Sequence, residues 1–317
     1  MTRRPPSLQR GVALLAAMLT VALVTTLAAA ALWQQWRLTE VERIARDRAQ
    51  ARWLLTGAMD WARTILREDA RSGGTQATDH LAEPWAVPLQ EARLSDFVAA
   101  APGSQLEADT AGLADRVFLS GRIVDAQSRL NVNNLVVDGQ PDRTSLQAFE
   151  RLFQLLGLPP QSLAALVQGL QAAGGSAPTR VLPSTVEQLT WLGLDETTLT
   201  RLTPFVSWLP LMTPVNLNTA SAEVLAASVP GLDLAQAQQL VRQRERRVWQ
   251  SLEDFQRDSG KSVNASTHSV SSNHFEVIGQ LRMGALQLTE RSAVYRSGGD
   301  VQWRSRQSLP TPPPFVQ

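Results

Sequence analysis

The sequence predicts an α+β protein in which a long N-terminal transmembrane and amphipathic helix precedes an antiparallel sheet with a large inserted all-helical domain. Three observations carry this prediction. An uncharged apolar run near the N-terminus continues into an amphipathic pattern, helical periodicity fills residues 142–265, and an alternating pattern begins after about residue 266. A chain of 317 residues, 44% of them hydrophobic, is long enough for about two packed domains.

Composition excludes several classes of protein. The 30 basic and 29 acidic side chains leave a net charge of +1, so no overall field favours nucleic acid or an acidic partner. No cysteine is present, which excludes thiol catalysis, disulfides and cysteine-ligated zinc. The chain has three histidines and no HExxH motif, and Phe255 stands where a P-loop ending at Lys261 needs glycine. We therefore expect no enzyme activity, no catalytic residues and no metal ligands.

Residues 12–36 predict a transmembrane helix. They carry no charge, and residues 12–32 as a helix span roughly 31 Å, close to the thickness of a bilayer core. Trp33 and Trp36 follow at the position of a headgroup boundary, and three arginines precede the run. By the positive-inside bias, the N-terminus lies in the cytoplasm and the rest of the chain lies across the membrane.

Three interpretations of this segment compete: a cleaved secretory signal, an uncleaved signal anchor, and a pilin-type leader that is cut before the apolar run. The small residues at 28–31 suit signal cleavage, but the run exceeds the usual apolar region of about 7–15 residues. Apolar residues then continue at three- and four-residue steps to about residue 66, with Arg and Glu between them. Because no proline interrupts residues 12–72, we predict one continuous helix with a membrane half and an amphipathic half.

The junction at Gly11 and Val12 separates the basic leader from the apolar run. It resembles the class III leader of type IV pilins and type II secretion pseudopilins. The resemblance implies that prepilin peptidase cuts after Gly11 and that Val12 becomes a methylated N-terminus. Most of those proteins carry Glu at the fifth mature position, where this chain has Ala16. A carboxylate at bilayer depth costs about 2.5–3.5 kcal/mol to insert. In lacking this Glu, the chain resembles the minor pseudopilin K family.

Residues 115–137 carry the most specific motif, DRVFLSGRIVDAQSRLNVNNLVV. Its apolar residues alternate on one face of a predicted strand: Val117, Leu119 and Ile123. We expect Asn131, Asn133 and Asn134 to hydrogen-bond nearby backbone in turns. The run resembles the pattern GRIxDxxGRxNxNNL of the minor pseudopilin K family, with Ser128 in place of the expected glycine.

From Asp142 the apolar pattern becomes helical, and Gly157 followed by two prolines ends the first predicted helix. Further helices are predicted at residues 161–173, 185–192, 196–209, 220–229, 234–248 and 252–258. Three strands are predicted at residues 274–283, 286–295 and 301–308, separated by turns that contain glycine. Strands on both sides of the helices indicate that the helical domain is inserted into one α/β unit.

Residues 216–247 contain NLNTA, then VPGL, then a helix rich in arginine. This run resembles the helix-hairpin-helix module, which also occurs in membrane-anchored DNA-uptake receptors and holds a phosphate between two glycines. Here Asp233 takes the place of the second glycine, and its carboxylate repels phosphate. Residues 142–265 contain ten basic and eleven acidic side chains, so we interpret the arginines as a solvated helix face and expect no nucleic acid binding. A DNA-uptake receptor is the alternative function.

Two features bear on metal binding. Asp79, His80 and Glu83 form one potential metal cluster, although an Asp cap and a buried Trp85 that closes a loop explain the same residues.

Relatives in the minor pseudopilin K family carry an acidic DWxDxD stretch after the second predicted helix of the inserted domain, and the resemblance implies calcium there. This chain has no carboxylate at residues 166–176, whereas calcium needs several, so we expect no cofactor.

These features identify the chain as a member of the minor pseudopilin K family of type II secretion systems. The resemblance implies a minor pseudopilin that forms the tip of the periplasmic pseudopilus and initiates its assembly for protein export. The expected partners are minor pseudopilins I and J, prepilin peptidase and the bacterial inner membrane, with no small-molecule substrate. The predicted segments are a leader (1–11), a transmembrane helix (12–36), the amphipathic half of the pilin helix (37–72), a pilin-like α/β part (73–141), the inserted helical domain (142–265), a second pilin-like part (266–310) and a disordered tail (311–317).

Overall fold

The computed structural model describes residues 8–72, 78–100, 112–174 and 181–310. The chain forms two compact units, residues 1–54 and residues 55–317. Helix α1 (Leu8–Ser72) begins in the first unit and ends in the second. Within the described residues, α1 is the one helix long and apolar enough to cross a membrane, and its most apolar stretch is exposed. The predicted tail and most of the predicted leader lie outside the described residues.

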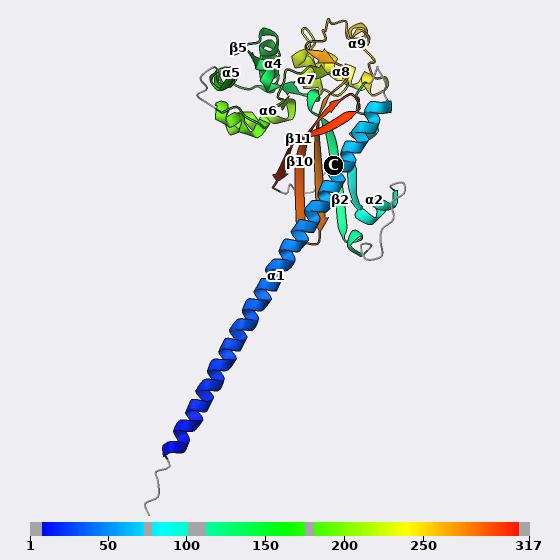
Figure 1. The fold of residues 1–317 in the computed structure, drawn as a ribbon. Helices are drawn as coiled ribbons and strands as arrows, with labels where there is room; N and C mark the ends of the chain where they lie inside the picture. The colour runs from blue at the N-terminus through cyan, green and yellow to red at the C-terminus, as the bar shows by residue number, and fades with distance from the viewer. Residues whose placement is uncertain (1–7, 73–77, 101–111, 175–180, 311–317) are drawn as a thin grey trace, which may run out of the picture. The chain divides into compact units, whose positions relative to one another are not determined.

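The second unit contains a five-stranded antiparallel sheet in the order β1-β2-β9-β10-β11 (Figure 1). Its strands are β1 (Leu89–Arg93), β2 (Val117–Asp125), β9 (His274–Met283), β10 (Leu286–Ser297) and β11 (Asp300–Leu309). The last three strands confirm the alternating pattern predicted after residue 266. Gly284 and Gly298 take positive φ in the two turns between these strands, a conformation that glycine adopts without a steric penalty.

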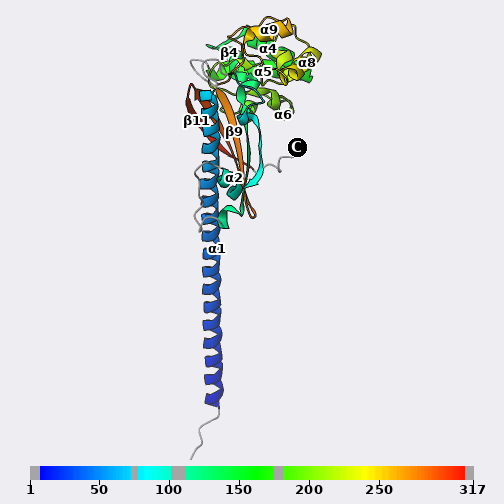
Figure 2. The same ribbon diagram turned by 90° about the vertical axis from the view of Figure 1, so that its right-hand side faces the viewer.

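The register of β2 and β9 shows where the helical domain is inserted. The two strands are hydrogen-bonded neighbours, and Asp125 at the end of β2 pairs with Phe275 near the start of β9. The chain therefore leaves the sheet and returns to it at the same end. Figures 1 and 2 both show the helices between these strands gathered at that end.

The C-terminal part of α1 packs on one face of the sheet (Figure 2). Leu55, Met59 and Leu66 are buried there. The close approach depends on Gly279 of β9, where a Cβ atom would lie 2.7 Å from Met59 Sδ and 3.1 Å from Leu55 Cδ1. Gly121 of β2 pairs directly with Gly279, so two glycines lie side by side under the helix.

Replacing Gly279 with alanine is expected to destabilise the second unit by about 1–3 kcal/mol, because Met59 or the helix backbone must move to admit the methyl group. Thermal unfolding of the full chain in detergent measures this effect. Gly299→Ala is the matched control, because a Cβ atom at Gly299 meets nothing within 4 Å. Equal unfolding midpoints for the two variants would show that α1 does not depend on the glycine contact.

The helical domain is built from helices α4 to α9. They are α4 (Arg143–Leu156), α5 (Pro160–Gly174), the 3-10 helix η5 (Val186–Leu192), α6 (Glu196–Leu202), the 3-10 helix η6 (Thr203–Phe205), α7 (Ala222–Ser228), α8 (Leu234–Arg244) and α9 (Leu252–Ser259). The start of α4 confirms the prediction, because the Asp142 side chain accepts a hydrogen bond from Ser145 N at 2.7 Å. Gly157 ends the helix in the left-handed conformation, with φ at 60°.

Two predicted helices are wrong in part. The helix predicted over residues 196–209 ends early, because Val206–Ser207 forms strand β6 and pairs in parallel with β3 (Leu130–Asn131). The helix predicted over residues 234–248 ends at Arg244. A second parallel pair joins β7 (Val215–Asn216) to β8 (His268–Ser269). Pairing with strands from outside the helical segment overrides the local helical pattern at β6.

Short elements complete the described chain. They are η2 (Pro84–Ala86), α2 (Leu94–Ala100), η3 (Ala126–Ser128), η4 (Val132–Leu135), β4 (Val136–Val137) and β5 (Gln140–Pro141). On β2, the predicted inward residues Val117, Leu119 and Ile123 are buried, which confirms the predicted face.

Candidate functional site

The predicted processing and assembly residues lie at the start of α1. The backbone of Gly11 is helical, and Val12 and Ala16 are exposed in the turns that follow. The hydroxyls of Thr20, Thr25 and Thr26 bond to carbonyl oxygens of their own helix at 2.9 Å. Such bonds satisfy polar side chains in a lipid environment, so the apolar segment presents a surface compatible with a bilayer.

Arg296 of β10 forms the centre of a buried ionic cluster near the end of α1. Its guanidinium contacts Asp69 of α1 at 2.7 Å and forms a second ion pair with Asp79. It also donates to the carbonyl oxygen of Ser272 at 2.8 Å and lies over the Phe275 ring. Because Asp79 is 1% exposed, this arginine compensates a carboxylate that water cannot reach.

Glu83 borders this cluster. It accepts hydrogen bonds from His80 N at 2.9 Å and from Trp85 Nε1 at 2.6 Å, and Trp85 is buried. Burial raises the pKa of Glu83 to about 7, with the charge on Asp69 adding to the effect. The predicted closure of a loop by Trp85 is confirmed, whereas the predicted Asp cap is wrong, because Asp79 forms an ion pair with Arg296.

The structure changes the membership of the suggested metal cluster. The carboxylates of Asp69, Asp79 and Glu83 lie within 4.8 Å of one another, and His80 is not part of the group. Two of the three carboxylates are already ion-paired with Arg296. This geometry favours a structural ion pair over metal coordination. Sequence reasoning missed Asp69 because nothing in the sequence separates this partly buried residue from the exposed acidic residues of the same helix.

A second buried network joins the sheet to the helical domain. Asp125, at the end of β2, accepts hydrogen bonds from Ser272 Oγ at 2.6 Å, Thr219 Oγ1 at 2.5 Å and Asn216 Nδ2 at 3.0 Å. Burial raises the pKa of Asp125 to about 6. Asn216 Nδ2 also donates to the carbonyl oxygen of Asp79, so the two networks are continuous. Both networks hold distant segments of the chain together.

Three asparagines of the specific motif, Asn131, Asn133 and Asn134, form what we call the asparagine clamp. Asn131 accepts locally from Asn133 N at 3.1 Å, which agrees with the predicted turn. Asn131 Nδ2 also donates to Asn134 Oδ1 at 3.0 Å, and further bonds reach a distant segment, residues 209–213. The amide donors and their acceptors are Asn131 Nδ2 to Leu211 O at 2.8 Å, Asn133 Nδ2 to Pro210 O at 3.1 Å and Asn134 Nδ2 to Thr213 O at 2.8 Å. The predicted role in nearby turns is therefore incomplete.

The geometry of the hairpin module does not support phosphate binding. The Asp233 carboxylate accepts from Gln236 N at 2.8 Å and caps α8, so it occupies the helix end that would face a phosphate. Arg244 is buried and donates to Leu217 O at 2.7 Å, and burial lowers its pKa to about 10. Arg247 lies 3.8 Å from Asp254. The interpretation of these arginines as a solvated helix face is therefore wrong for Arg244, which is buried, and agrees with Arg247, whose side chain is 64% exposed.

The segment expected to hold calcium in relatives does not fit the ion here. Leu166 and Leu170 of α5 are buried in the core of the helical domain, and α5 contributes no carboxylate. Residues 175 and 176 of the same stretch lie outside the described residues.

Comparison with known proteins shows the family. Family models described as type II secretion system (T2SS), protein K match residues 128–211 and 215–275. Type II secretion system protein K of Pseudomonas aeruginosa is 30% identical over 304 residues, covering 87% of this chain and 85% of the relative. The chain belongs to the type II secretion system protein K family. The corresponding protein of Klebsiella pneumoniae is 28% identical, covering 92% of this chain and 93% of the relative.

A solved structure shows the same fold. One chain in the crystal structure of the GspK-GspI-GspJ complex from the enterotoxigenic Escherichia coli type 2 secretion system matches with a TM-score of 0.63 at 18% identity. The match covers 85% of this chain and 99% of that chain. Membership of this family confirms a minor pseudopilin of the type II secretion system, anchored in a membrane by α1. The family is one of structural pseudopilins and is not known as a family of enzymes.

Proposed function

We propose that this minor pseudopilin forms the tip of the periplasmic pseudopilus with minor pseudopilins I and J, and that it initiates assembly of the filament. The observation that carries the proposal is the helical domain inserted between β2 and β9. The choice of partners is supported by the structurally similar GspK chain, which belongs to a GspK-GspI-GspJ complex.

The size of the inserted domain is the physical argument for the tip. A compact domain of 124 residues has a radius of gyration of about 14 Å, hence a diameter near 35 Å. Pilin-like subunits overlap their long helices side by side, so each globular part lies close beneath the next. At an interior position, the inserted domain would collide with the subunit above it. The terminal position is free of this clash.

The proposed membrane topology follows from the proposed role as a minor pseudopilin. Residues 1–11 are the cytoplasmic leader, which prepilin peptidase removes, and residues 12–36 span the bacterial inner membrane. Residues 37–69 present an amphipathic helix that packs with the equivalent helices of the other minor pseudopilins. The rest of the chain is periplasmic.

Ala16 fits a subunit with no neighbour ahead of it, because no amine of a preceding subunit then needs a carboxylate partner. Ala16→Glu is therefore expected to give no gain in secretion and to add about 2.5–3.5 kcal/mol to the cost of membrane insertion. Membrane fractionation and a secretion assay in cells that lack the wild-type protein measure both effects, with Ala16→Gln as the uncharged control. Clearly higher secretion with Ala16→Glu would refute this account of Ala16.

The position in the filament is tested by labelling. Because the chain has no cysteine, Glu150→Cys on the exposed side of α4 gives a single site for a gold or fluorescent label. We expect the label at one end of sheared pseudopili, in about one copy per filament, while the cysteine-free chain remains unlabelled. Label at regular intervals along the shaft would show that the inserted domain packs inside the filament.

A further inference from the structure

Negative charge exceeds positive charge in the buried ionic cluster at the end of α1. The carboxylates of Asp69, Asp79 and Glu83 lie within 4.8 Å of one another. Arg296 is ion-paired with Asp69 and with Asp79, so its one positive charge already faces two carboxylates before Glu83 is counted. Carboxylates held this close oppose one another's ionisation. Three carboxylates beside one guanidinium therefore favour a state in which one of them keeps a proton.

The cluster is shielded from solvent, which strengthens this effect. Asp79 is 1% exposed, and the side chains of Asp69 and Glu83 are 14% and 16% exposed. Repulsion between partly buried charges is screened by salt much less than repulsion between charges on the surface. A full charge on all three carboxylates would therefore destabilise the cluster.

Two other titratable groups face the cluster, and neither balances its charge. His80 Nε2 lies 3.9 Å from Glu83 Oε1, and burial lowers the pKa of His80, so its imidazole is uncharged at neutral pH. Asp125 lies behind Asp79, and Ser272 donates to both, from N to Asp79 at 2.7 Å and from Oγ to Asp125 at 2.6 Å. Among the described groups that face the cluster, none supplies a second cation at neutral pH.

Glu83 is the carboxylate best placed to hold the proton. Within the part of the chain that the structure describes, Arg296 is ion-paired with the two aspartates and not with Glu83. Glu83 Oε2 already accepts from His80 N at 2.9 Å and from Trp85 Nε1 at 2.6 Å, which leaves Oε1 to carry the proton. Burial raises the pKa of Glu83 to about 7, with the charge on Asp69 adding to the effect, so this proton exchanges near neutral pH.

We propose that a proton shared between Glu83 and a neighbouring carboxylate acts as a latch, which holds the loop of residues 78–87 on the end of α1 and opens when the proton is lost. The loop carries Trp85, whose ring packs edge-on against Phe275 of β9 with the centroids 5.2 Å apart. Glu83 holds the indole N–H of this tryptophan. When Glu83 is charged, repulsion from the two aspartates pushes it away from the position in which it holds the loop.

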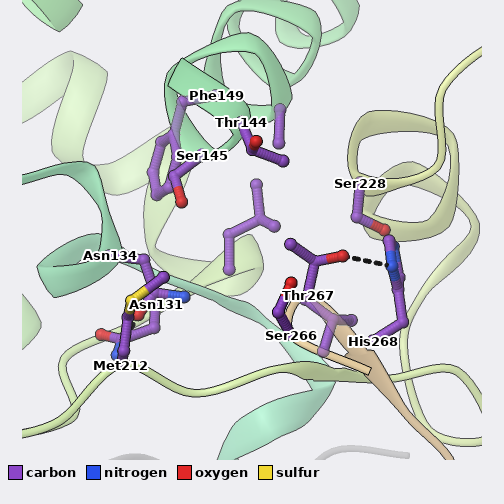
Figure 3. Close-up of a pocket in the computed structure, with 13 residues that line it drawn as sticks. Asn131, Asn134, Thr144, Ser145, Phe149, Met212, Ser228, Ser266, Thr267 and His268 are labelled. Atoms are coloured by element: carbon purple, nitrogen blue, oxygen red, sulfur yellow. Dashed lines mark hydrogen bonds between the residues drawn. The ribbon is translucent and has the colours of Figure 1, made fainter. Parts of the chain in front are cut away.

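The latch is expected to weaken as the pH rises. The folded chain raises the pKa of Glu83 from its ordinary value of 4.5 to about 7, so the proton's stabilisation is complete below about pH 4.5 and is lost as the pH rises through about 7. The buried His268 does not add to this response. Its ring lies beside Ser228 and Thr267 (Figure 3), and burial lowers its pKa to about 4, so it stays uncharged through the same range.

Amide hydrogen exchange of the full chain in detergent, read by mass spectrometry of peptides that cover residues 78–87, tests the latch at pH 5.5 and pH 8. Wild type and Glu83→Gln are compared at the same pH, so the chemical exchange rate cancels. The glutamine keeps an oxygen that accepts from His80 N and Trp85 Nε1, and it places an N–H where the shared proton lies. We expect equal exchange at pH 5.5, and about fivefold or more faster exchange of the wild-type loop at pH 8.

Two variants serve as controls. Glu68→Gln makes the same change at an exposed acid near the end of α1, where the side chain is 75% exposed, and should exchange like the wild type at both pH values. His80→Gln should keep the wild-type response, because the proton lies on the carboxylate. A further readout needs no variant: exchange of the wild-type loop relative to that of α4 should increase from pH 5.5 to pH 8.

Four results would overturn the proposal. Wild type and Glu83→Gln might exchange alike at pH 8, or the variant might be less protected than the wild type at both pH values, which would show that Glu83 acts in its charged form. Loss of the response in His80→Gln would place the proton on the imidazole. A constant ratio of loop exchange to α4 exchange in the wild type would show that the loop does not open with pH.

Discussion

Gly11→Val is expected to leave the protein uncut, with its intact mass unchanged from that of the full precursor. The wild-type protein should instead lose 11 residues and gain one methyl group on Val12. The reason is that cleavage between Gly11 and Val12 keeps the whole apolar segment as the anchor, and a branched side chain at position 11 obstructs the peptidase. Intact mass spectrometry of protein extracted from membranes measures the difference.

Gly57→Val is the matched control, because Gly57 lies in the same helix and a Cβ atom there meets nothing within 4 Å. This variant should be processed like the wild type. A mature mass that corresponds to cleavage after Ala30 or Ala31 would show a removed secretory signal, and the anchored pseudopilin topology would be wrong. Normal processing of Gly11→Val would also contradict the assigned site.

Arg296→Met is expected to lower the free energy of unfolding of the second unit by about 3–5 kcal/mol. The variant leaves Asp79 buried without a counter-ion and removes the contact with Asp69 at 2.7 Å. Burial already raises the pKa of Asp69, so loss of the guanidinium makes the charged form less favourable still. Denaturant unfolding of the full chain in detergent, followed by tryptophan fluorescence, measures the change.

Arg304→Met provides the control on the neighbouring strand. Arg304 is exposed and lies over the Tyr295 ring, a contact worth about 0.5–1 kcal/mol at an exposed site. The two arginines share a residue type and a sheet, and they differ in burial and in ion pairing. Similar losses for both variants would show that the cluster around Arg296 does not hold the end of α1 to the sheet.

The continuous networks explain how the inserted domain is joined to the pilin-like sheet. Asp125 and Phe275 face each other where the chain leaves and re-enters the sheet, and Asp125 is bonded to Thr219 and Asn216 of the inserted part. The same asparagine contacts Asp79, which is ion-paired with Arg296. The junction between sheet and insertion is therefore a set of buried polar bonds beside the core. Such bonds are directional, so they fix one orientation more strictly than apolar packing does.

Local signals were sufficient for much of the fold. Helix α4 was predicted to within a residue at each end, because Asp142 and Gly157 act on the backbone that immediately follows or precedes them. Strands β9, β10 and β11 were predicted from alternation and from glycines in the turns, which are also properties of neighbouring residues. The helical prediction failed beyond Phe205, where strand β6 pairs with residues far away in the chain.

The sequence by itself determined the apolar anchor and the order of helices and strands, because each depends on residues a few positions apart. It predicted the insertion from strands on both sides of the helices, and the pairing of β2 with β9 confirms it. Only the tertiary structure decided which polar residues meet. Asn133 bonds to Pro210 across 77 residues, and Arg296 reaches Asp79 across 217 residues. Contacts of this kind depend on how the chain returns to itself, which local periodicity does not encode. The asparagines and the ionic cluster therefore acquired their roles only when the folded chain brought their partners together.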